Sequence, residues 1–112
     1  MRPLKSYETE LLSKISLRTL NSDPLPFASM LAEDVAPEDK DWYHVKFFYV
    51  DSVLGAEGYS ILLDWCAADL DGAPLELLAL GSAIGRPYEL EIRRLDQQPI
   101  IELPSVEKWR SR

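Results

Sequence analysis

In the stretch Tyr88-Glu89-Leu90-Glu91-Ile92-Arg93, apolar and charged residues alternate one by one. Successive side chains of a β-strand point to opposite faces of a sheet, so this alternation is typical of a strand with one buried face and one exposed face. Half-buried strands of this kind occur mainly in antiparallel sheets. The stretch therefore predicts an antiparallel sheet in the second half of the chain.

Three stretches further upstream predict more strands of this sheet. Trp42 to Val50 is rich in aromatic and β-branched residues, Tyr59 to Ala68 has apolar residues at its odd positions, and Leu75 to Leu80 is almost wholly apolar. Between the last two lies Asp69-Leu70-Asp71-Gly72, and an Asp-Gly pair favours the positive φ angles of a hairpin turn. Consecutive hairpins of this kind indicate a meander.

The residues before the first strand predict a helix. Ser6 is suited to cap it, because a serine hydroxyl accepts a hydrogen bond from a free N–H of the first turn, and Glu8 places negative charge near the positive end of the helix dipole. Apolar residues at helical spacing follow, and they are Tyr7, Leu11, Leu12 and Ile15. The helix should end near Arg18 to Leu20, before the breaker cluster Asn21-Ser22-Asp23-Pro24.

The remaining segments complete the predicted fold. Leu25 to Leu31 predicts two helical turns, Glu33 to Asp41 an exposed acidic loop, and Pro99 to Pro104 an extended arm along a sheet edge. The chain of 112 residues has room for one domain, residues 1–112. We expect an α+β domain in which the N-terminal helix or helices pack on a four- to five-stranded antiparallel meander sheet.

The net charge of −7 limits the classes of partner. Acidic residues concentrate in the central segment, since residues 22–76 hold twelve acidic and two basic side chains. Negative charge repels phosphate, which argues against nucleic acid or an anionic membrane as the partner. The charge favours a basic protein surface or a cation as the partner, or serves solubility alone.

The sequence carries little that indicates catalysis or metal binding. His44 and Cys66 are the single histidine and cysteine, so a Cys–His dyad needs their two strands to pair, and zinc would lack ligands. Asp69-x-Asp71-Gly72 begins like a calcium loop, but Leu80 stands at its twelfth position, where an EF-hand has glutamate. We therefore predict a protein that is not an enzyme and that needs no metal and no cofactor.

Features of the whole chain predict a cytoplasmic location. One cysteine allows no intrachain disulfide, no apolar stretch follows the N-terminal residues as in a secretory signal, and no window of 18 apolar residues is present. We expect a monomer or a weak dimer without a membrane partner.

The acidic segment leads directly into two aromatic residues. Carboxylates attract a basic partner, and aromatic rings beside them provide anchoring area. The predicted partner-binding residues are Glu33, Asp34, Glu38, Asp39, Asp41, Trp42 and Tyr43, with Asp69 and Asp71 secondary. The alternative is a solvated loop that leads into a strand of the core.

Several short motifs resemble a family of small bacterial proteins. They are Arg2-Pro3-Leu4, Glu8-x-x-Leu11-Leu12, the Asp71-Gly72 turn, the strand Tyr88 to Ile92, and the arm Pro99 to Pro104. In size and acidity the chain is also similar to immunity proteins of contact-dependent toxin systems. The resemblance implies a cytosolic protein that binds and neutralises a basic toxin domain, such as a nuclease, by occluding its active site.

Two other roles stay open on the sequence alone. A small ligand would occupy a pocket between helix and sheet near Trp65, Tyr88 and His44, and an accessory structural domain would dimerise through a sheet edge.

Overall fold

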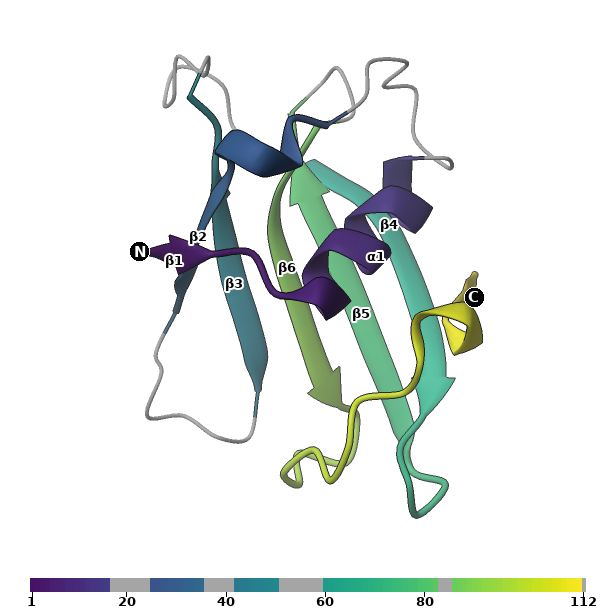
Figure 1. Ribbon diagram of the computed structural model, residues 1–112. Coiled ribbons are helices and arrows are strands. Elements are labelled where there is room, and N and C mark those ends of the chain that lie inside the picture. Colours follow the sequence, from purple (N-terminus) through teal and green to yellow (C-terminus); the bar gives the residue numbers. More distant parts are fainter. Residues whose placement is uncertain (17–24, 36–41, 51–59, 83–85, 112) are drawn as a thin grey trace.

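The computed structural model describes residues 1–16, 25–35, 42–50, 60–82 and 86–111 (Figure 1). These residues form one seven-stranded sheet with the order β1-β2-β3-β6-β5-β4-β7, in which all neighbours are antiparallel. The strands are β1 (Arg2–Pro3), β2 (Leu31–Asp34), β3 (Tyr43–Phe48), β4 (Ser60–Ala68), β5 (Pro74–Gly81), β6 (Pro87–Arg94) and β7 (Arg110–Ser111). The helical elements are α1 (Ser6–Ser16) and the 3₁₀ turns η1 (Phe27–Ser29) and η2 (Val106–Lys108).

The predicted fold class is wrong in two respects. The sheet has seven strands instead of four or five, and the described residues contain one α-helix of eleven residues. The sheet is also not a simple meander, because β3 pairs with β6 while β4, β5 and β6 follow one another as hairpins. The extra strands β1, β2 and β7 have two to four residues, too few to show an alternating pattern in the sequence.

The four longer strands lie where the sequence placed them, which confirms those predictions. The segment before β3 differs from its prediction. Leu25 to Leu31 does not form two α-helical turns, since η1 covers only Phe27–Ser29 and Leu31 begins β2. Glu33 and Asp34 belong to β2 instead of a loop, and residues 36–41 lie outside the described part of the chain.

Helix α1 begins one residue earlier than its predicted cap implies. Its first hydrogen bond runs from Thr9 N–H to the Lys5 carbonyl (3.0 Å), so Lys5, and not Ser6, is the capping residue. The Glu8 carboxylate accepts a hydrogen bond from the free Lys5 N–H (2.8 Å), which is half of a capping box. The helix then lays its buried residues Leu11, Leu12 and Ile15 against one face of the sheet (Figure 1).

Strand register divides the side chains between two faces. On the face covered by α1, Val45, Leu90 and Ala79 are cross-strand neighbours, and all three are fully buried. The opposite face, which we call the helix-free face, has no described helix over it (Figure 1). No described helix is long and apolar enough to span a membrane.

A β-bulge changes the predicted orientation of β4. The register between β4 and β5 shifts between Ile61 and Leu63, and Ile61 pairs with Leu80 on the helix-free face. The sequence placed Ile61, Leu63 and Trp65 on one apolar face. The bulge separates Ile61 from the other two and leaves it 61% exposed.

Candidate functional site

The helix-free face carries rows of charged and apolar side chains that run across the strands. The first row begins at Trp42, just before β3, and follows the cross-strand neighbours Arg93, Glu76, Cys66 and Arg110. The second row is His44, Glu91, Leu78 and Asp64. The third row is Glu33, Lys46, Glu89, Leu80 and Ile61.

Trp42 is an exposed aromatic residue of this face. Its side chain is 44% exposed, and the Arg93 guanidinium carbon lies 5.7 Å from the centre of its ring. Arg93 Nε and Nη2 lie 3.1 and 3.0 Å from Glu76 Oε1. An exposed indole, an exposed guanidinium and the largely buried Glu76 carboxylate thus follow one another along the row. Large exposed rings are uncommon on protein surfaces and are enriched where partners bind.

Two hollows flank Trp42. One of about 150 Å³ is lined by Trp42, Glu76, Leu78, Glu91 and Arg93. The other, of about 360 Å³, lies toward the end of β6 and is lined by Trp42, Arg93, Arg94, Leu95 and Gln97. Trp42 and Arg93 line both hollows, so the two hollows adjoin the same pair of side chains.

His44 lies in the second row and binds a glutamate. Its Nε2 is 2.9 Å from Glu89 Oε1, and its Nδ1 is 3.8 Å from Glu91 Oε1. The dyad with Cys66 does not form, because β6 and β5 lie between β3 and β4, a separation of roughly 14 Å at about 4.8 Å per strand. The described residues also contain no cluster of three or more His, Cys, Asp or Glu side chains that could hold a metal ion.

The structure separates the predicted partner-binding residues of the first group. Glu33 is exposed on the helix-free face, whereas Asp34 is an exposed residue that pairs with Arg2 (2.8 Å). Trp42 is exposed, but Tyr43 is partly buried and its hydroxyl donates a hydrogen bond to Glu8. Burial, followed by the hydrogen bond to Glu8, raises the pKa of Tyr43. Three further predicted residues, Glu38, Asp39 and Asp41, lie outside the described part of the chain.

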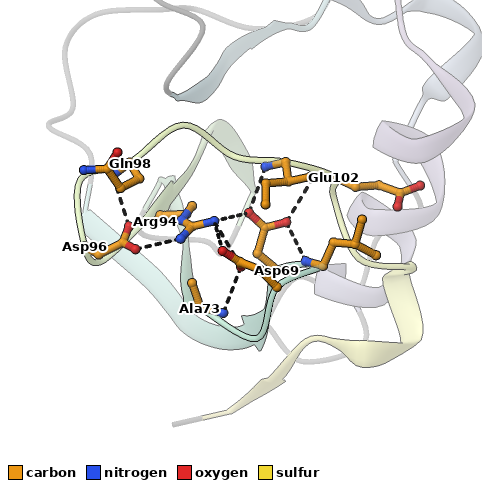
Figure 2. A network of polar contacts seen from close by, with 9 residues as sticks. Asp69, Ala73, Arg94, Asp96, Gln98 and Glu102 are labelled. Atoms are coloured by element: carbon orange, nitrogen blue, oxygen red, sulfur yellow. Dashed lines mark hydrogen bonds and ion pairs between the residues drawn. The ribbon is translucent and has the colours of Figure 1, made fainter.

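Asp69 and Asp71 belong to a network around Arg94 (Figure 2). Arg94 Nη1 donates to Asp69 (3.1 Å) and to both oxygens of Asp71 (3.0 and 3.1 Å). On its other side, Arg94 Nε and Nη2 donate to Asp96 (3.0 and 2.7 Å). The guanidinium therefore occupies the centre of three carboxylates, and Asp69, only 4% exposed, faces its own chain.

Asp69 also binds backbone N–H groups of the C-terminal segment. It accepts hydrogen bonds from Leu70 (2.7 Å), Ile101 (2.8 Å) and Glu102 (3.0 Å). Burial alone would raise the pKa of Asp69, but these backbone hydrogen bonds and Arg94 outweigh it and lower the pKa to about 2. The Arg94 hydrogen bonds likewise lower the pKa of Asp96 to about 2. This network joins the turn after β4 to Ile101 and Glu102.

The residues of the predicted small-ligand pocket do not meet in one place. Trp65 is buried on the face covered by α1, and Tyr88 packs edge-on against Tyr49 with 4.9 Å between the ring centres, while His44 lies on the helix-free face. A hollow of about 380 Å³ lies elsewhere, between the end of β4 and the C-terminal segment. It is lined by Ala68, Asp69, Leu70, Glu102, Leu103, Pro104, Ser105 and Lys108.

Sequence reasoning missed three residues beside Trp42, namely Glu76, Glu91 and Arg93. A signal for two of them was present, because the alternation from Tyr88 to Arg93 places Glu91 and Arg93 on the exposed side of β6. What the sequence lacked was the pairing of β3 with β6, which brings them next to Trp42. Glu76 gave no signal, because it stands within an apolar run.

Comparison with known proteins finds no matching family model, no matching curated protein and no matching solved structure. Any proposal of a function for this chain therefore rests on its charge and geometry.

Proposed function

We propose that this chain binds a basic protein domain on its helix-free face and acts in the cytoplasm as an immunity-type protein that neutralises a toxin by occlusion. One observation carries the proposal. Trp42, 44% exposed, stands beside Glu76 and Glu91 on a sheet face that no described helix covers. Exposed rings with carboxylates beside them supply both anchoring area and attraction for a basic surface.

The charge of the chain supports a basic partner. The net charge is −7, and the segment that runs into Trp42 contains Glu38, Asp39 and Asp41 against a single Lys40. Carboxylates in the second and third rows, Glu89 and Glu91 among them, extend the acidic character across β6. Charge of one sign raises the association rate of an oppositely charged protein and repels nucleic acid.

The apolar residues of the same face support a protein as the partner. Leu31 and Ile61 are 42% and 61% exposed and lie near opposite edges of the helix-free face. A stable interface buries roughly 800 Å² on each partner and combines apolar contact with a polar surround. Exposed apolar side chains among charged ones fit that composition.

The test first identifies a secreted protein whose gene adjoins that of this chain and uses its C-terminal domain as the probe, because immunity-type proteins protect against a toxin made by the same cell. We expect a complex that forms rapidly at low salt and more slowly as salt is added. The variant E38K/D39K/D41K should lower the association rate about tenfold. Stopped-flow or surface plasmon resonance measurements give that rate.

The matched control is E10K/E102K/E107K, which changes the net charge equally at three exposed positions of α1 and the C-terminal segment. It should slow association much less. Absence of a complex, or equal slowing by both triple variants, would overturn the proposal.

A further inference from the structure

The smaller hollow beside Trp42 has the size of a site for one side chain. Its volume is about 150 Å³, well below the roughly 300–1,000 Å³ of small-molecule pockets. The Trp42 ring and Leu78 supply apolar walls, Glu76 and Glu91 supply carboxylates, and Arg93, which is paired with Glu76, completes the lining. Such a lining suits a side chain with an apolar stem and a cationic end.

Among the described residues, one carboxylate of the hollow, Glu91, has no arginine or lysine partner within 4.0 Å. Glu76 is paired with Arg93, whereas the basic group within 4.0 Å of Glu91 among the described residues is His44 Nδ1, at 3.8 Å. The His44 imidazole lies closer to Glu89, whose Oε1 is 2.9 Å from Nε2, than to Glu91. Glu91 thus has room for a guanidinium partner, which Glu76 already has in Arg93.

Arg93 shows how this surface holds a guanidinium. Its Nε and Nη2 lie at hydrogen-bond distance from Glu76, and its guanidinium carbon is 5.7 Å from the centre of the Trp42 ring. Cations within about 6 Å of an indole centre are attracted by the ring. The site already pairs one guanidinium with one carboxylate and the ring, and Glu91 provides a second carboxylate.

The geometry points to this hollow as a receptor for one arginine side chain of the basic partner. The guanidinium binds Glu91 and lies against Trp42, and its methylene groups contact Leu78. Arginine fits better than lysine, because a planar guanidinium binds a carboxylate through two N–H groups and stacks on an aromatic ring. The inference rests on the proposed function and adds the residue that the partner inserts.

A short peptide tests the receptor without the partner. The probe is acetyl-Gly-Arg-Gly-amide, and its comparison peptides carry citrulline or lysine in place of arginine. Trp65 and Trp109 are 4% and 1% exposed, so a fluorescence response to the peptide reports mainly on Trp42. We expect the arginine peptide to change this fluorescence and to shift the NMR signals of the Trp42 indole and of residues 76–78 and 91–93. The citrulline peptide should do neither.

Two glutamate variants separate the site from the overall charge. Glu91→Gln should weaken binding of the arginine peptide about fivefold or more, because it removes the charged acceptor. Glu10→Gln, at an exposed position of α1, changes the net charge equally and should leave binding unchanged. Trp42→Phe should abolish the fluorescence response, and thermal unfolding of each variant verifies that it is folded.

The outcomes separate this inference from the proposed function. Equal binding of the lysine peptide, or equal effects of Glu91→Gln and Glu10→Gln, would overturn the arginine receptor. A partner complex that forms with unchanged affinity in Glu91→Gln would also overturn it, while the proposed function would stand. Loss of peptide and partner binding in Glu91→Gln alone supports both.

Discussion

The Arg2 guanidinium binds the Glu8 carboxylate through two parallel contacts, Nη1 to Oε1 at 2.8 Å and Nη2 to Oε2 at 2.7 Å. Glu8 is fully buried at the start of α1 and also accepts hydrogen bonds from the Tyr43 hydroxyl and the Lys5 N–H. Arg2 extends the contact to Asp34 through its Nε and Nη2. One buried carboxylate thus joins β1, β3 and α1.

Replacing Glu8 should destabilise the protein strongly. In Glu8→Gln the buried site loses its negative charge, and Arg2 and Tyr43 lose a charged acceptor. We expect the free energy of unfolding to fall by about 2–4 kcal/mol, measured by urea denaturation. Glu10→Gln, an exposed position of the same helix, should change it by less than about 0.5 kcal/mol. Equal losses in both variants would contradict the role of Glu8.

Stability should fall as the solution is acidified. The pKa of Asp69 is about 2 in the folded protein, below its ordinary value, and those of Glu8 and Asp34 are also lowered. Because a lowered carboxyl pKa means that the unfolded chain binds protons more readily, the stabilisation is present above about pH 4 and is lost as the pH falls toward 2. Urea denaturation between pH 7 and pH 2 measures this decline.

Asp69→Asn serves as the comparison for the pH series. It removes one of the groups whose pKa is lowered, so stability at pH 7 should decrease while the decline between pH 4 and pH 2 becomes shallower. A decline of unchanged steepness would show that Asp69 does not contribute to it.

An added methyl group at Gly81 should be poorly tolerated. A Cβ there would meet the Arg86 carbonyl oxygen and would lie 2.6 Å from Leu62 Cδ1, at the register shift between β5 and β6. We expect Gly81→Ala to lower the free energy of unfolding by about 1–3 kcal/mol, measured by thermal or urea denaturation. Gly72 is the comparison, because a Cβ there meets nothing within 4 Å although its φ of 87° favours glycine. Gly72→Ala should therefore cost only about 1 kcal/mol.

The Tyr7 hydroxyl holds the C-terminal segment on α1. It donates to the Pro104 carbonyl (2.7 Å) and accepts from Trp109 Nε1 (2.9 Å), and Trp109 is 1% exposed. Tyr7→Phe leaves both partners without this hydroxyl and should lower the free energy of unfolding by about 1–3 kcal/mol. Ser13→Ala, which removes an exposed hydroxyl bonded within the helix, should have little effect. A larger effect of Ser13→Ala in urea denaturation would contradict this assignment.

The sequence predicted the elements with long, regular patterns. The alternation from Tyr88 to Arg93 located β6, and the apolar stripe of Leu11, Leu12 and Ile15 located α1. Local pattern does not reveal which strands pair, because the contact of β3 with β6 depends on residues more than forty positions apart, such as Val45 and Leu90. The predicted meander was therefore wrong although its strands were correctly located.

The candidate site, like the strand pairing, could be predicted only in part from local sequence pattern. Trp42 was identified from the acidic residues before it, and the structure places it on the surface. Asp69 was also selected for its charge, but charge in a sequence does not distinguish an exposed carboxylate from one that binds Arg94 and two distant backbone N–H groups. Glu8 was assigned only an interaction with the helix dipole, because its partner Tyr43 follows 35 residues later.

The order of the strands has a consequence for folding kinetics. Strands β4, β5 and β6 pair with their neighbours in the sequence, so their hairpins close short loops. Helix α1 precedes the four longer strands β3 to β6, and its Tyr7 contacts Trp109 across 102 positions. Contacts between such distant residues form slowly, because chain entropy is lost before they stabilise the structure. We expect the three hairpin strands to assemble first and α1 to dock, together with the C-terminal segment, as the last step.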